Sequence, residues 1–323
     1  MVRKRGIGKV GMLLAAVVMA GMSVASFILQ PSHMPGVDEG ICLPSPNLWT
    51  INRVSSWLIN MVLLGGVAIG SFFLNRTFNF IRSTQPVLPA MFLLLVGSCP
   101  WITFQLCSST LICVVNLLSL SVLFNTFKSS NATQEMFTIG TLLSVGSMFQ
   151  YAFLAMLPAY IVSAIVMKAF RIKEALALIM GLVAPYWVVL GLGLISPDAF
   201  RMPQFTNLFQ EYIGSTELGV LVAAVGFAIF FGSLLGLNNG IKLYAGNSHV
   251  NAMNMSITLL GAVSIICIVV DFSNILAYLS TFYFTVAVQV ANLCALWNIR
   301  HEWLVVAVPG VLYVGFFLAM VLV

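Results

Sequence analysis

Charge is scarce in this sequence. Only 7% of its 323 residues are Asp, Glu, Lys or Arg, whereas 60% are hydrophobic. Soluble domains carry about 25% charged residues, so this chain has too little polar surface to face water on all sides. The deficit excludes a soluble protein and predicts a polytopic membrane protein. The net charge of +5 then indicates positive loops beside anionic lipid headgroups, and no nucleic acid partner.

Motifs for metal or redox chemistry are missing as well. The six cysteines form no CxxC pair, and the three histidines are scattered without ligand spacing. Five of the cysteines lie within apolar runs, where free Cys behaves as a small hydrophobic side chain. We therefore expect neither a metal centre nor a resident cofactor from these residues. Cys42 alone lies in a polar loop, and a disulfide from it to Cys99 or Cys107 is the alternative to six free thiols.

Ionisable residues are absent from the apolar runs. Because such residues usually mark ion and proton pathways, their absence argues against a proton- or sodium-coupled transporter. The polar residues in the runs are amides and hydroxyls. Gln289 and Asn292 share one helix face, and we expect them to form interhelical hydrogen bonds. Two glycine pairs have the GxxxG spacing of closely packed helices, Gly66 with Gly70 and Gly232 with Gly236.

The apolar runs themselves are numerous. They cover residues 11–29, 56–74, 89–127, 136–167, 175–195, 218–237, 252–270, 275–296 and 304–323. The run 89–127 holds 39 uncharged residues, too many for one span at ~1.5 Å per residue across a ~30 Å core. We therefore expect a hairpin there, with its turn between Cys99 and Ser109.

The run 136–167 poses a sharper problem. Two crossings of about 15 residues each would be shorter than the usual ~17 to 25 residues. Either these helices are short and thin the bilayer, or the pair re-enters without crossing, with the turn at Gln150 and Tyr151. The sequence thus predicts an all-α polytopic bundle of about 10–11 spans, with short or re-entrant helices near 89–127 and 136–168. The chain 1–323 is expected to form a single membrane domain.

Basic residues fix the expected orientation. If the runs alternate in direction, twelve of the 14 Lys and Arg residues fall on one side, with only Arg53 and Arg201 on the other. This bias predicts a cytoplasmic N-terminus and exterior loops at 30–55 and 196–217. The first run follows four basic residues and is long enough for an uncleaved anchor. A signal peptide cleaved near Ser23-Val24-Ala25 is the alternative.

The exterior loops carry the candidate site. Asp38 and Glu39 lie between Pro35-Gly36 and Gly40, just after the first span. They are candidate catalytic residues, as a general base or as ligands of a divalent cation, for a substrate whose lipid tail lies in the outer leaflet. Asp198 and Arg201 are candidate substrate-binding residues in the second loop, with Arg201 as a partner for phosphate. The alternative is two solvated loops with their ordinary share of acids.

Two resemblances add to this interpretation. Val37-Asp38-Glu39-Gly40 resembles the acidic motif in the first exterior loop of the GT-C superfamily, membrane glycosyltransferases that use polyprenyl-phosphate sugar donors. That resemblance implies a lipid-linked sugar as substrate, although the basic, aromatic-rich run and the large C-terminal exterior domain of better-known branches are missing. Residues 116–185, which include Arg171-Ile172-Lys173-Glu174, resemble an uncharacterised family of bacterial polytopic inner-membrane proteins. This second resemblance implies a place in the bacterial inner (cytoplasmic) membrane.

Three functional hypotheses follow. The first is a multi-pass inner-membrane protein of cell-envelope biogenesis that acts as a GT-C-like transferase on a lipid-linked substrate at the outer face. The second is a non-catalytic membrane subunit of an envelope-assembly complex, with membrane-protein partners. The third is a flippase or transporter with an uncharged path, suggested by the broken runs near Pro100, Pro158 and Pro185.

Overall fold

A computed structural model describes residues 9–29, 40–49, 51–82, 86–203, 205, 216–244, 247–296 and 302–322. Throughout these ranges the regular structure is helical, and no strand occurs in them. The long helices are α1 (Lys9–Leu29), α2 (Arg53–Phe78), α9 (Ile172–Gly191), α10 (Thr216–Tyr244), α11 (Ser248–Val270), α12 (Ile275–Leu296) and α13 (Glu302–Leu322). Seven helices in the described ranges are long and apolar enough to cross a membrane. Short 3-10 turns also occur between the helices. The prediction of an all-α multi-pass membrane protein is confirmed.

Shorter helices fill the middle of the chain. They are α3 (Val87–Gly97), α4 (Pro100–Thr103), α5 (Ser108–Phe124), α6 (Thr133–Phe149), α7 (Ala152–Ala155) and α8 (Leu157–Val166). The two expected turns lie where the sequence placed them, between α3 and α5 and at Gln150 and Tyr151. Short helices therefore occupy both regions: residues 89–127, which are too many for one ordinary span, and residues 136–168, which are too few for two.

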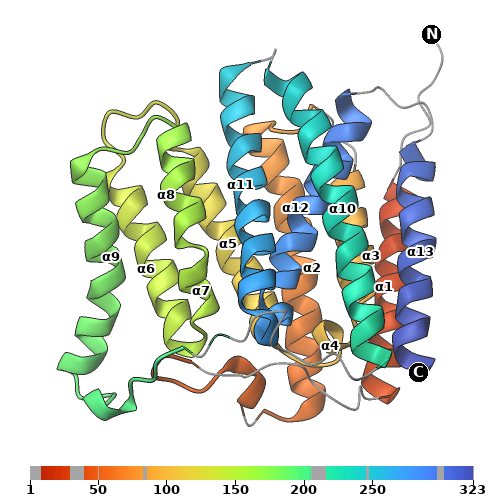
Figure 1. Cartoon of the computed structure of the whole chain (residues 1–323), viewed down its shortest axis with the longest axis horizontal. Helices are drawn as coiled ribbons and strands as arrows, with labels where there is room; N and C mark the ends of the chain where they lie inside the picture. Colours follow the sequence, from red (N-terminus) through yellow and green to blue (C-terminus); the bar gives the residue numbers. More distant parts are fainter. Residues whose placement is uncertain are drawn as a thin grey trace.

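The helices stand side by side, and consecutive segments alternate in direction (Figure 1). α1 begins at the upper end of the bundle in this view, and α13 ends at the lower end. The turns and adjoining helix ends at the upper end carry six basic residues whose side chains are described: Arg76, Arg82, Lys128, Lys168, Arg171 and Lys173. We call this the basic end. The segments 40–49, 51–52 and 192–203 lie at the opposite end, which we call the loop end (Figure 1).

α12 is the central helix. Residues buried inside the protein make up 83% of its most apolar stretch, against 22% to 44% in the other six long helices. Its polar side chains pair with its neighbours. Gln289 Nε2 donates to Thr258 Oγ1 of α11 at 3.0 Å, and Asn292 Nδ2 donates to Asn254 Oδ1 at 2.6 Å. The predicted interhelical hydrogen bonds of Gln289 and Asn292 are confirmed.

The turn between α3 and α5 is buried. All four residues of α4 are inaccessible, including Trp101. Asn60 Nδ2 of α2 donates to the Ile102 carbonyl at 2.7 Å, and the Ser23 hydroxyl of α1 donates to the Thr103 carbonyl at 3.0 Å. These bonds satisfy carbonyls at the end of a four-residue helix, where no further turn follows. The hairpin therefore turns inside the bundle.

The structure corrects several details of the sequence interpretation. All six thiols are free, so the disulfide from Cys42 to Cys99 or Cys107 is not formed. Gly66 has nothing within 4 Å of an added Cβ, so the Gly66/Gly70 pair does not mark a close crossing at Gly66 within this chain. Asp271 and Glu174, which flank apolar runs in the sequence, are buried, with 1% and 2% of their surface exposed.

Candidate functional site

The candidate catalytic residues Asp38 and Glu39 lie outside the described residues. The segment that follows them, Gly40 to Leu43, packs on the loop end of α6. The Leu43 amide donates to the Met148 carbonyl at 2.8 Å, and the Ile41 amide donates to the Ser147 carbonyl at 3.4 Å. A Cβ at Gly40 would lie 2.6 Å from the Met148 carbonyl oxygen, so only glycine allows this close approach.

The second loop joins the first through its backbone. The Arg201 amide donates to the Ile41 carbonyl at 2.8 Å. Between the two loops lies a cavity of about 370 Å³, lined by Gly40, Cys42, Leu43, Pro44, Leu48, Asp198, Ala199 and Arg201. The structure thus brings the predicted substrate-binding residues Asp198 and Arg201 into one cavity with the segment that directly follows Asp38 and Glu39.

The cavity combines apolar walls with charge at its rim. Asp198 and Arg201 are both exposed, whereas the chain at Gly40 is buried beneath them. Cys42 lies in the wall, and its partial burial raises the pKa of its thiol because the thiolate would be poorly solvated. A guanidinium at such a rim is suited to a phosphate group.

Asp271 is a buried carboxylate at the loop end, and its burial could not be predicted from the sequence. Tyr151 contacts the loops, since it borders the space between Gly40 and Arg201, and its ring packs edge-on against Phe205 at 5.5 Å. Its hydroxyl donates to Asp271 Oδ2 at 2.7 Å. Tyr151 therefore connects the two loops to Asp271 in the protein interior.

Asp271 ends α11 and receives several donors. The Tyr278 hydroxyl donates to Oδ2 at 2.7 Å, while Asn274 Nδ2 and the Ser273 hydroxyl donate to Oδ1 at 3.2 and 3.3 Å. Burying an unpaired carboxylate is costly, and these three hydrogen bonds, with that from Tyr151, offset the cost. Only the position of Asp271 after an apolar run was visible in the sequence. No local signal indicated the donors.

The described part of the chain contains no group of three or more His, Cys, Asp or Glu side chains that could hold a metal ion. At the cavity, the carboxylate available from the described residues is Asp198. A divalent cation would therefore need ligands from the segment that contains Asp38 and Glu39.

No protein family model, curated protein or solved structure matches this chain.

Proposed function

We propose that this multi-pass membrane protein acts in bacterial cell-envelope biogenesis as a GT-C-like transferase that binds a lipid-linked substrate at its loop end. The observation that carries the proposal is the cavity of about 370 Å³ between the two loops, which has Asp198 and Arg201 at its rim. Glu39 directly precedes Gly40 of the cavity wall in the sequence. A headgroup in this cavity would stand at the bilayer surface while its lipid tail remained in the membrane.

The proposed roles follow from charge. Arg201 pairs with the phosphate of the substrate, because a guanidinium presents several donors to phosphate oxygens. Asp38 or Glu39 serves as the general base or as a ligand of a divalent cation. Tyr151, which borders Gly40 and Arg201, is held in place by its hydrogen bond to Asp271. In this arrangement Asp271 is a positioning residue, because it is buried behind the cavity.

One observation favours the second hypothesis, a non-catalytic subunit. One face of α2 is apolar and exposed, and it consists of Leu58, Val62, Ile69 and Phe73 around Gly66. An added Cβ at Gly66 would meet nothing within 4 Å, so packing inside this chain does not require glycine there. A small residue on an open helix face suits close approach by a helix of another membrane protein.

A flippase or transporter has no comparable support. The polar residues of the central helix α12 are hydrogen-bonded to neighbouring helices, as with Gln289 and Thr258. Paired amides of this kind are a common way to join helices in a membrane.

The transferase proposal is tested in cells that lack the protein, by mass spectrometry of extracted lipid-linked sugars. We expect a polyprenyl-phosphate-linked intermediate to accumulate, and the wild-type protein to clear it. A double variant, Asp38→Asn with Glu39→Gln, should be present in the membrane at normal level but leave the intermediate in place. The matched control is Glu135→Gln on α6, near the basic end. Full clearance by the double variant would overturn the transferase and leave the subunit hypothesis.

Binding is tested separately with the purified protein and a polyprenyl phosphate. Replacement of Arg201 by Ala removes a charge-assisted hydrogen bond worth about 1.5 to 3 kcal/mol, so affinity should fall by about tenfold or more. Arg76→Ala, an exposed arginine at the basic end, is the matched control and should bind as the wild type does. Equal affinity of the Arg201 variant and the wild type would show that the cavity does not hold the phosphate.

A further inference from the structure

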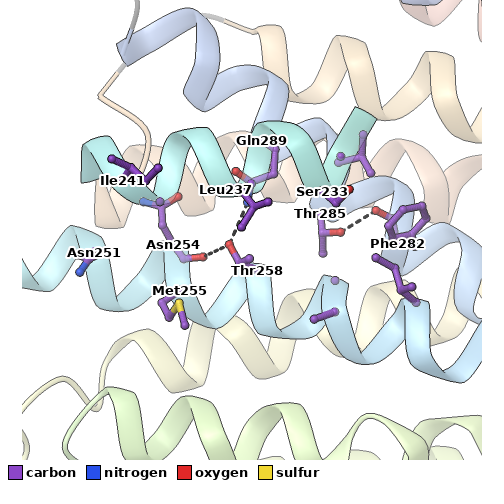
Figure 2. Close-up of a pocket in the computed structure, with 17 residues that line it drawn as sticks. Ser233, Leu237, Ile241, Asn251, Asn254, Met255, Thr258, Phe282, Thr285 and Gln289 are labelled. Atoms are coloured by element: carbon purple, nitrogen blue, oxygen red, sulfur yellow. Dashed lines mark hydrogen bonds between the residues drawn. The ribbon is translucent and has the colours of Figure 1, made fainter. Parts of the chain in front are cut away.

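A second cavity opens on the side of the bundle, far from the two loops. It is a groove of about 510 Å³ between α10 and α11, with α12 as its floor (Figure 2). Two glycines of α10 leave this space open. An added Cβ at Gly236 would find its nearest neighbours at 3.9 Å, on Gln289 and Thr258, and one at Gly240 would meet nothing within 4 Å. Beside Gly236 and Gly240 the groove is therefore open space, whereas at Gly232 an added Cβ would lie 2.8 Å from Val286 of α12.

The chemistry of the groove is apolar. Leu237, Ile241 and Met255 form its rim and are exposed by 73%, 78% and 47%. The polar groups at the floor are already paired, because Gln289 Nε2 donates to Thr258 Oγ1 and the Thr258 hydroxyl donates to the Asn254 carbonyl at 2.9 Å (Figure 2). Since these groups need no further partner, the groove suits an apolar occupant.

The length of the groove distinguishes between apolar occupants. Along α10 it runs from Gly232 to Ile241, about 15 Å at ~1.5 Å per residue, and along α11 from Asn251 to Ile265, about 22 Å. Both lengths fall short of a ~30 Å hydrocarbon core, of which one leaflet is about half. A transmembrane helix of a partner would need a groove along the whole core and about 10 Å wide. One lipid chain fits the observed length.

Charge complementarity identifies the leaflet. Ile241, at one end of the groove, lies three residues before the end of α10 at the basic end (Figure 1). Asn254 Nδ2 donates to the Phe80 carbonyl at 2.8 Å, so the turn that carries Arg82 lies beside the groove. Lys128 follows Phe127, whose ring lies 4.4 Å from that of His249 at the start of α11. α11 and α12 contain no Asp or Glu. This setting attracts an anionic headgroup.

We propose that the groove holds one acyl chain of an anionic phospholipid from the leaflet at the basic end, with its headgroup near Arg82 and Lys128. The site is independent of the proposed transferase function, because it lies in the opposite leaflet and takes a structural lipid.

The test uses the full-length protein in vesicles of phosphatidylcholine and phosphatidylglycerol. A trace of phosphatidylglycerol carries a photoreactive diazirine in the middle of one acyl chain, and labelled residues are mapped by mass spectrometry after irradiation. We expect labelling of Leu237 and Met255 to exceed that of ordinary lipid-facing positions such as Val62 on α2 and Val311 on α13. Even labelling of all four positions would overturn the proposal. So would labelling of Met255 below that of Val311, since a helix of a second copy in the groove would exclude the lipid probe.

Variants that fill the groove make the test specific. In Gly236→Leu and Gly240→Leu we expect labelling of Met255 to fall to the level of Val311, while Gly315→Leu, at an open position on α13, leaves it unchanged. Undiminished labelling in a folded variant would overturn the proposal. If one of the two variants fails to fold, labelling of Met255 is compared in the other. With wild-type protein, a phosphatidylcholine probe at the same mole fraction should label Met255 less than the phosphatidylglycerol probe. Equal labelling would overturn the anionic assignment.

Discussion

Asp271 is a carboxylate held in the interior by hydroxyl and amide donors. The hydroxyls of Tyr151 and Tyr278 both lie 2.7 Å from its Oδ2. Tyr151 follows α6 and Tyr278 belongs to α12, so one side chain ties together three parts of the loop end. The packing of the loop end beside the cavity therefore depends on an acid that contributes no side chain to the cavity lining.

Removing this acceptor should destabilise the protein. In Asp271→Ala two buried tyrosine hydroxyls lose their partner, and each unpaired group costs about 1 to 3 kcal/mol. We expect the midpoint of thermal unfolding in detergent, followed by circular dichroism, to drop clearly, and Asp271→Asn to lose less because one acceptor oxygen remains. Asp198→Ala, an exposed acid of the same end, should change stability by no more than about 0.5 kcal/mol. Equal stability of Asp271→Ala and Asp198→Ala would contradict the role of Asp271.

Cys42 gives a pH-dependent probe of the cavity wall. Burial raises the pKa of its thiol, so a smaller fraction is thiolate at any given pH below the shifted value. Because the thiolate is the nucleophile, the rate of maleimide labelling should reach half its maximum at a higher pH than for a fully exposed thiol. The reference is Met202→Cys in a Cys42→Ala background, since Met202 is 89% exposed. Coincident pH profiles would show that Cys42 is not buried in the cavity wall.

At the residue scale, the sequence predicted which polar side chains form hydrogen bonds better than it predicted which acids are buried. It identified Gln289 and Asn292 as interhelical donors because an amide within an apolar run has few other uses. It showed Asp271 and Glu174 only as acids that flank apolar runs. Their burial depends on distant residues: Asp271 meets Tyr151, 120 positions away, and Glu174 Oε1 accepts from the Ala132 amide at 3.4 Å. A single sequence carries no record of such pairs.

At the scale of elements, two glycines allow α6 and α9 to cross closely. An added Cβ at Gly140 would lie 2.5 Å from the Leu178 carbonyl oxygen, and one at Gly181 would meet the Phe137 carbonyl oxygen still more closely. The Ser144 hydroxyl donates to the Leu182 carbonyl at 2.6 Å across the same crossing. Backbone contact of this kind replaces the side-chain packing that longer helices would supply.

This crossing should not tolerate a methyl group. Gly140→Ala or Gly181→Ala would force the helices apart, and overpacking of this kind costs about 1 to 3 kcal/mol. Gly191→Ala, at the far end of α9 where nothing lies within 4 Å, is the matched control and should be neutral or slightly stabilising. The measurement is the thermal unfolding midpoint of the purified proteins. If Gly140→Ala unfolds at the same temperature as Gly191→Ala, the close crossing does not exist in the membrane.

The sequence predicted the existence of the short elements, but it could not predict their surroundings. Chain length forced a turn within 89–127, because 39 uncharged residues cannot form one span. The burial of α4 depends instead on donors from α1 and α2, at Ser23 and Asn60. Length and hydropathy are local properties, whereas satisfaction of the α4 carbonyls is a property of the assembled bundle.

At the scale of the whole molecule, the alternation of helices sorts the charges. The six described basic residues of the basic end lie opposite the segments that contain Arg53 and Arg201 (Figure 1). The sequence predicted this separation from run order alone, since each added crossing exchanges the sides of all later loops. It also predicted that both loops share one end, but not that the Arg201 amide bonds to the Ile41 carbonyl and closes a cavity.

The direction of the protein in the membrane decides which solution the cavity faces. Lys and Arg remain preferentially on the cytoplasmic side, so we expect the basic end inside the cell and the loop end outside. In a Cys42→Ala background, Met202→Cys should react with an impermeant maleimide in intact cells, whereas Ser130→Cys, exposed between α5 and α6, should react only after permeabilisation. The reverse pattern would place the cavity in the cytoplasm. Arg201 could then meet only substrates of the inner leaflet, and an outer-face transferase would be excluded even if every helix stood as described.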